Sequence, residues 1–146
     1  MKKKTVLKIV LFVIYIIVLS YLLFLSESMG RTNWHFGVNL VPFAEIRRYI
    51  THISTIGVLY VGINLLGNVA VMIPFGYALP SLFGQGRRRP ILYVIIGMLF
   101  SILIEIAQFF THTGTCDVDD VILNTVGVVI GYLIYSILHR KQREKL

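Results

Sequence analysis

The sequence has few charged residues, a single cysteine and no recognisable linker between domains. Cys116 alone excludes an internal disulfide and a metal site built on a cysteine pair. Charged residues make up only 14% of the chain, and they cluster between long uncharged runs. No nucleic-acid-binding module, internal repeat, low-complexity segment or linker rich in proline, glycine and serine is present. Residues 1–146 are therefore predicted to form a single domain.

What the chain has in abundance is hydrophobic sequence, which makes up 56% of it, with a mean hydropathy of +0.78. These values are typical of membrane proteins. A helix of about 20 apolar residues crosses a hydrocarbon core about 30 Å thick. We therefore predict an all-α polytopic membrane protein, a four-helix transmembrane bundle whose main partner is the lipid bilayer and which needs no cofactor. Its spans are expected at about residues 5–25, 56–79, 91–110 and 121–138.

The first run has an alternative interpretation as a secretory signal peptide. Lys2, Lys3 and Lys4 would form its basic start, and Ser26 and Ser28 would flank a cleavage site. The apolar run is longer than the about 7–15 residues of a signal-peptide core, which favours an uncleaved span.

Between the first two spans, the sequence predicts a short amphipathic helix after Pro42. Arg47, Arg48 and His52 form its polar face, which favours a helix lying among the lipid headgroups. The alternative is a lid over an outward-facing site, with Arg47 or Arg48 contacting lipid phosphates. In the second span, Pro74 is expected to kink the helix or to begin its exit.

The basic residues predict the topology, because short cytoplasmic loops carry an excess of lysine and arginine. Four spans put both termini on one side, and 11 of the 14 basic residues fall there. We therefore expect both termini to be cytoplasmic. The net charge of +7 then reports topology rather than a surface for nucleic acid. The other three basic residues are Arg31, Arg47 and Arg48.

Polar and small residues share faces on three spans. At about 100° per residue, each of two sets falls within an arc of about 80°. On the third span the set is Gly97, Ser101, Glu105, Gln108 and His112. On the fourth it is Asp117, Asp120, Asn124, Gly127, Gly131 and Tyr135, whereas Asp119 points away. Asn64 and Asn68 lie one turn apart on the second span, near Gly57 and Gly67. Because small residues let membrane helices approach, these faces are predicted to meet in the outer half of the bilayer.

Two interpretations of these polar residues remain open. As packing elements, the amides would hydrogen-bond across helices, and Asp117 or Asp119 would cap the fourth helix. As a site, the ligand-binding candidates are Asn64, Asn68, Glu105, Gln108, Asp117, Asp120 and Asn124. Glu105 and Asp120 are the catalytic candidates, because acidic groups inside a membrane are costly and are often functional. Asp117 and Asp120 are weak metal candidates, since the turn lacks the glycine and closing glutamate of an EF-hand.

The ordered motifs resemble those of the VanZ-like membrane proteins. They are Asn39-x2-Pro42-Phe43, Asn64-x3-Asn68-x5-Pro74-x-Gly76, Glu105-x2-Gln108 and Asp117-x-Asp119-Asp120-x3-Asn124-x2-Gly127-x3-Gly131. One departure is the turn Gly114-Thr115-Cys116, where family members often have an arginine.

The resemblance implies a multi-pass protein of the bacterial plasma membrane, linked to low-level resistance to the lipoglycopeptide teicoplanin. It implies no established reaction, so the first hypothesis is a non-enzymatic protein that recognises a lipid-linked envelope precursor or a lipoglycopeptide. The alternative is an intramembrane enzyme acting on phospholipid or lipid-linked phosphate with an acidic metal site. A small transporter and an assembly partner for an envelope complex are further alternatives, and the sequence does not determine the oligomeric state.

Overall fold

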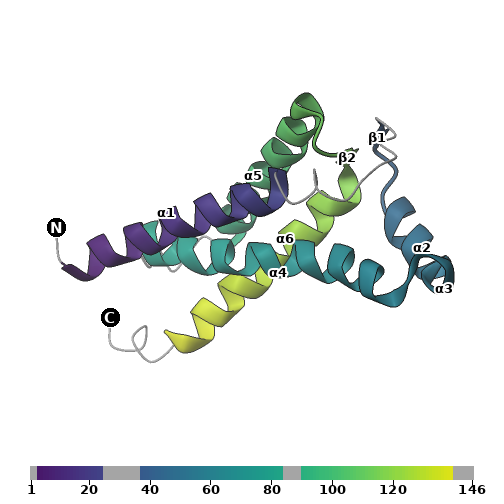
Figure 1. The fold of residues 1–146 in the computed structure, drawn as a ribbon. Helices are drawn as coiled ribbons and strands as arrows, with labels where there is room; N and C mark the ends of the chain where they lie inside the picture. The colour runs from purple at the N-terminus through teal and green to yellow at the C-terminus, as the bar shows by residue number, and fades with distance from the viewer. Residues whose placement is uncertain (1–2, 25–36, 84–89, 140–146) are drawn as a thin grey trace.

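The computed structural model describes residues 3–24, 37–83 and 90–139. It contains four long helices, α1 (Lys3–Phe24), α4 (Val58–Phe83), α5 (Pro90–Thr111) and α6 (Val118–Leu138) (Figure 1). Each is long and apolar enough to cross a membrane. The predicted all-α, four-span bundle is therefore confirmed.

Two short helices, α2 (Ala44–Thr51) and α3 (Ile53–Ile56), stand between the first two spans, where one amphipathic helix was predicted. Two strands of two residues each, β1 (Val38–Asn39) and β2 (Cys116–Asp117), were not predicted and form a parallel pair.

Several sequence predictions concern residues outside the described ranges. They are the basic residues at 2, 31, 87–89 and 140–145 and the alternative cleavage site at 26–28.

The second span is longer than predicted. Helix α4 runs on to Phe83 and contains both Pro74 and Pro80. Each proline removes one backbone hydrogen-bond donor from the helix. In lipid, a chain that stays helical keeps its other backbone groups hydrogen-bonded, whereas a chain that unwinds would expose them. Pro74 therefore lies inside the helix and does not end it, contrary to one of the two expectations for it.

The core lies where α6 crosses α4. A Cβ built on Gly127 would stand 2.2 Å from the Val69 carbonyl oxygen, and one on Gly131 would stand 2.0 Å from that of Ile73. In the other direction, Gly76 of α4 lies against the backbone of Val128. The glycines thus let the two backbones touch, as predicted for this pair on α6. The buried hydrophobic residues around this crossing are Leu19, Met72, Phe75, Leu79, Tyr93 and Val128.

Helix α1 lies at the edge of the bundle. Leu19 reaches the core, while most of the apolar side chains of α1 are exposed. The hydroxyl of Tyr15 donates a 2.7 Å hydrogen bond to the Val71 carbonyl of α4. This bond fixes the position of α1 along the axis of α4.

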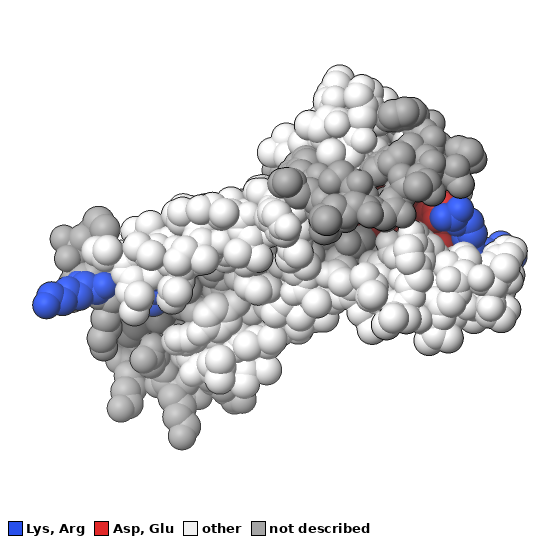
Figure 2. Space-filling view, in the orientation of Figure 1, with Lys and Arg blue, Asp and Glu red and all other residues white. Residues whose placement is uncertain are grey.

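The two ends of the molecule differ in what they carry. The start of α1 and the end of α6 lie at one end, whereas α2, α3 and the strand pair lie at the other (Figure 1). Charged side chains in the space-filling view gather at both ends, over the start of α1 and over α2 (Figure 2). The white surface between them shows no lysine, arginine, aspartate or glutamate side chain (Figure 2), and the four long helices expose many large hydrophobic residues there, as a lipid-facing surface would.

Candidate functional site

The acidic turn before α6 begins with a helix cap. Asp117 is extended, with φ −122° and ψ 124°, and its carboxylate accepts the N–H of Asp119 at 2.8 Å. A side chain in this position satisfies a backbone donor that the helix leaves unpaired, and it contributes about 1 kcal/mol. Of the two predicted capping residues, Asp117 is therefore the one that caps α6.

Asp117 is also held from the other side by Asn39. The strand pair places the two residues opposite each other. The Asn39 side-chain amide donates to both carboxylate oxygens of Asp117, at 3.1 and 3.2 Å. Its own oxygen accepts the N–H of Val41 at 3.1 Å, which turns the chain toward α2. Asn39 thus joins the segment after α1 to the start of α6.

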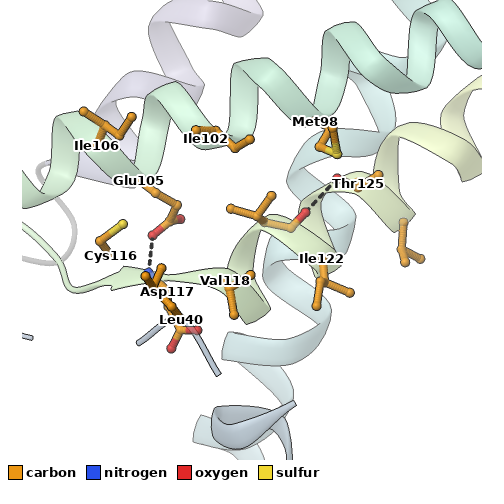
Figure 3. Close-up of a pocket in the computed structure, with 12 residues that line it drawn as sticks. Leu40, Met98, Ile102, Glu105, Ile106, Cys116, Asp117, Val118, Ile122 and Thr125 are labelled. Atoms are coloured by element: carbon orange, nitrogen blue, oxygen red, sulfur yellow. Dashed lines mark hydrogen bonds between the residues drawn. The ribbon is translucent and has the colours of Figure 1, made fainter. Parts of the chain in front are cut away.

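Glu105 bonds to the same turn from α5. Its side chain is 3% exposed, and one oxygen accepts the N–H of Asp117 at 3.0 Å (Figure 3). A carboxylate inside a membrane protein is costly unless donors compensate it. The backbone of β2 supplies such a donor, which explains how Glu105 is accommodated at the end of an apolar helix.

Asp119 has a role that sequence analysis missed. It is 1% exposed, and its carboxylate accepts the backbone N–H groups of Phe43, Glu45 and Ile46. The last two bonds measure 2.8 and 3.0 Å. Helix α2 is preceded by Phe43 and has no side-chain cap of its own, so its unpaired donors are satisfied by a residue 73 to 76 positions away in sequence.

One signal in the sequence could have pointed to this contact. The residue before α2 is Phe43, in a left-handed conformation with φ 65°, where serine, threonine, aspartate or asparagine would cap a helix. An uncapped helix start needs an acceptor from elsewhere. Helical periodicity places Asp119 off the face of α6 that carries Asp120 and Asn124, so the pattern of the fourth span alone does not predict its contact with α2.

Two of the predicted amides hydrogen-bond across helices. Asn68 of α4 donates to Asp120 of α6, and Asn124 of α6 donates to the Ser101 hydroxyl of α5 at 2.8 Å. These bonds confirm part of the packing interpretation, in which membrane helices are joined by polar side chains. Asn124 is 3% exposed, and its side-chain oxygen has no partner among the described residues.

Asn64 does not join this group through a hydrogen bond. It donates at 2.8 Å to the carbonyl of Tyr60, one turn earlier in its own helix. Gly57 and Gly67, expected on the same close-packed face, have no neighbour within 4 Å of a built Cβ. The small residue that brings α4 close to α6 is Gly76, in the other half of the helix. The predicted small-residue face of α4 was therefore wrong in position.

The predicted faces of α5 and α6 are buried with few exceptions. On α5 only His112, in a left-handed turn just beyond the end of the helix, is exposed. On α6 only Asp120 is half-buried rather than buried. Four acidic residues from these two helices and β2 therefore lie together at one end of the bundle, and we call them the carboxylate cluster: Glu105, Asp117, Asp119 and Asp120.

The oxygens of this cluster are largely occupied by amide donors. Within the described ranges, no three histidine, cysteine, aspartate or glutamate side chains are placed to hold a metal ion. Of the two metal candidates, Asp117 accepts bonds from Asn39 and Asp119, and Asp120 accepts one from Asn68. A cation would therefore have to compete with bonds that hold the fold.

Burial dominates the electrostatics of the turn. It raises the pKa of Asp117, and the nearby Asp119 carboxylate adds to this, while the Asp119 N–H, Asn39 and Arg48 act in the opposite direction. Burial also raises the pKa of the Cys116 thiol, with further contributions from Glu105 and Asp117. Cys116 is therefore a weak nucleophile at neutral pH.

An apolar groove between α5 and α6 ends at Glu105 and Asp117 of the cluster (Figure 3). Its volume is about 570 Å³, within the range of about 300–1,000 Å³ common for ligand sites. Met98, Ile102 and Ile106 of α5 form one wall, and α6 forms the other with Val121, Ile122, Thr125 and Val126. Leu40, Glu105, Cys116, Asp117 and Val118 close one end. The groove thus has an almost entirely apolar surface, and Glu105 and Asp117 stand at its end with their carboxylates bonded to amide donors.

Comparison with known proteins agrees with this arrangement. The sequence model of the VanZ/LLP1 family matches residues 12–139. The chain belongs to the VanZ/LLP1 family. The matched range contains the whole carboxylate cluster, both groove walls and Asn39.

A curated relative has the same family name. Protein VanZ of Enterococcus faecium is 26% identical to this chain over 140 residues, covering 92% of this chain and 77% of the relative. No solved structure matches this VanZ/LLP1 protein. The resemblance noted from the sequence motifs is confirmed.

Proposed function

We propose that this VanZ/LLP1 protein binds an amphiphile in the outer leaflet of the bacterial plasma membrane and thereby lowers susceptibility to teicoplanin. The groove between α5 and α6 is the observation that carries this proposal. Its surface is almost entirely apolar and suits an apolar chain, and Glu105 and Asp117 stand at its end. A lipoglycopeptide and a lipid-linked envelope precursor both have such a chain joined to a polar head.

The charge distribution supports the orientation. The described lysines lie in α1, at the end where α6 finishes, whereas Arg47 and Arg48 lie in α2 at the other end with the carboxylate cluster (Figures 1 and 2). Counted along the sequence, 11 of the 14 basic residues fall on the side of the termini. Basic residues mark the cytoplasmic side. Both termini are then cytoplasmic, and the cluster and the groove end face outward. A reporter fused after Leu146 that is active only when exported would contradict this orientation.

The proposed role is binding rather than catalysis. Asp117 and Asp119 accept backbone and amide donors that position β1, α2 and α6, which weighs against a metal-dependent reaction on a lipid phosphate. Glu105→Gln tests this directly, because a glutamine oxygen can still accept the Asp117 N–H. A binding role predicts that Glu105→Gln, and separately Asp120→Asn, keep most activity. If either stably made variant is inactive, the enzyme alternative gains support.

The direct test compares teicoplanin susceptibility in a deletion strain and in strains complemented with variants. Ile122→Trp fills the groove, whereas Leu133→Trp adds the same bulk to an α6 position that is 50% exposed and outside the groove. We expect the wild type and Leu133→Trp to lower susceptibility, and Ile122→Trp to fail although it reaches the membrane in equal amount.

A glycopeptide without an acyl chain serves as the matched drug, and its potency should change less. If neither deletion nor overexpression alters the minimal inhibitory concentration of teicoplanin, this chain has no role in resistance.

A further inference from the structure

The segment from β1 to the end of α2, residues 38–51, contributes Leu40 to the end of the groove, and we call it the strap. The strap buries little of itself. Neither α2 nor α3 contains a buried residue, and Ile50 is 61% exposed. Hydrophobic burial therefore contributes little to holding the strap in place. Its position depends on polar contacts instead.

Those contacts converge on two carboxylates at the start of α6. Asp119 accepts three backbone N–H groups from the first turn of α2. Asp117 accepts the side chain of Asn39, which also pairs with it in the strand ladder. Hydrogen bonds to a charged acceptor are the stronger kind, and losing the acceptor leaves several donors unpaired at once.

The strap also forms part of the groove. Leu40 stands at the closed end beside Glu105, Cys116 and Asp117 (Figure 3). It is itself 70% exposed, so it covers the groove end without being embedded in the core. Moving the strap outward would carry Leu40 away and open the carboxylate end.

We propose that the strap is a gate over the carboxylate end of the groove, and that Asp119 is the positioning residue that latches it closed. The identity of the ligand that would pass the gate rests on the proposed function. The role of Asp119 in holding the strap does not depend on that function. Asp119 acts through the α2 backbone. It is therefore not a ligand contact, and it sets how often the groove end is accessible.

The chain contains its own reporter for this gate. Cys116 is the single cysteine, it lines the groove end, and it pairs with Val38 of the strap. Cys116 is half-buried, so a change in its rate of reaction with an alkyl maleimide, in purified protein at one pH, reports a change in access at this end of the groove. Asp119→Ala should raise this rate about tenfold or more, because the open fraction grows as the latch bonds are lost.

Asp120→Asn is the matched control. It neutralises the neighbouring carboxylate, which accepts a hydrogen bond from Asn68 of α4. Its Cys116 should react at the wild-type rate. A general loosening of the bundle would raise both rates, and equal increases in the two variants would overturn the proposal.

Amide hydrogen exchange provides the second measurement. In Asp119→Ala, the amides of Phe43, Glu45 and Ile46 should exchange about tenfold faster, while those in the middle of α4 and α6 keep their protection. Asn39→Ala, which removes the clasp on Asp117 from the strap side, should also speed Cys116 labelling, and it leaves α6 unchanged in sequence.

Unchanged labelling in both Asp119→Ala and Asn39→Ala would refute the gate. Equal loss of protection along α4 and α6 would instead show that Asp119 only holds the fold together. Neither readout uses an antibiotic, so the gate can fail while the proposed function stands, and the reverse also holds.

Discussion

Replacing Gly131 by alanine tests whether contact between the backbones of α4 and α6 holds the bundle together. The new methyl group would stand 2.0 Å from the Ile73 carbonyl oxygen and 2.8 Å from the backbone nitrogen of Tyr77. Ordinary contact begins near 3.4 Å, so the helices must separate by about 1.4 Å at this level. Neither clashing atom can rotate away, because both are backbone.

The cost can be estimated from what the separation removes. Overpacking that forces a backbone shift costs about 1–3 kcal/mol. A gap of about 0.5–1 Å already forfeits a quarter to a half of each dispersion contact, and Met72 and Val128 beside it are almost fully buried. Alanine returns up to about 1 kcal/mol through its higher helix propensity. We expect a net loss of about 2 kcal/mol in the free energy of unfolding.

The assay is reversible unfolding of the purified protein in mixed micelles, followed by circular dichroism. Gly62→Ala is the control within the same bundle, since nothing lies within 4 Å of a Cβ there. It should be neutral or should stabilise the protein by up to about 1 kcal/mol. If Gly131→Ala is as stable as Gly62→Ala, the close approach of α4 and α6 is not what holds the bundle.

Three further predictions concern single side chains. His112 adopts φ 57° just after α5, and the N–H of Thr113 donates back to the Gln108 carbonyl. Because glycine adopts a positive φ without strain, His112→Gly should raise the free energy of unfolding by about 0.5–1 kcal/mol in the same assay. A loss of stability would mean that the imidazole itself contributes. Tyr15→Phe removes the hydrogen bond between α1 and α4 and should lower the free energy of unfolding by about 1 kcal/mol. Amide hydrogen exchange should become faster in α1 and stay unchanged in α6. An equal increase in exchange in both helices would contradict this prediction. Burial raises the pKa of Asp117, so folding favours the protonated carboxyl group more than the unfolded chain does. The resulting contribution to the free energy of unfolding is complete below the ordinary pKa range of a carboxyl group. It is lost as the pH rises through the raised pKa of the folded protein. Melting temperature against pH should therefore fall less steeply for Asp117→Asn over that window, and parallel curves would refute the assignment.

The four spans could be predicted from the sequence because length and hydropathy are properties of one segment at a time. The buried faces of α5 and α6 could also be predicted, since helical periodicity places Ser101, Glu105 and Gln108 together whatever surrounds them. Periodicity does not reveal which half of a helix meets its neighbour. Gly76, rather than Gly67, faces α6 for that reason.

The strand pair and the Asp119 contact could not be predicted in the same way. Two residues per strand are too few to show an alternating pattern. The Asp119 contact joins a side chain on α6 to backbone donors of α2, and backbone donors are present in every residue but proline. Only the missing cap at Phe43 marks that helix start as one that needs an outside acceptor.

The hydrogen bonds of the carboxylate cluster also limit how a ligand could be recognised. The carboxylate of Asp119 accepts hydrogen bonds from the backbone of α2, and that of Asp117 accepts them from Asn39 and from the start of α6. Asp120 accepts one from Asn68. The groove therefore offers mainly apolar contact, in which each buried methylene contributes about 0.8 kcal/mol. Selectivity should then follow chain length and shape more than head-group charge. Because Asp117 both lines the groove and clasps the strap, a head group that competes for its oxygens would loosen the Asn39 contact and favour the open gate.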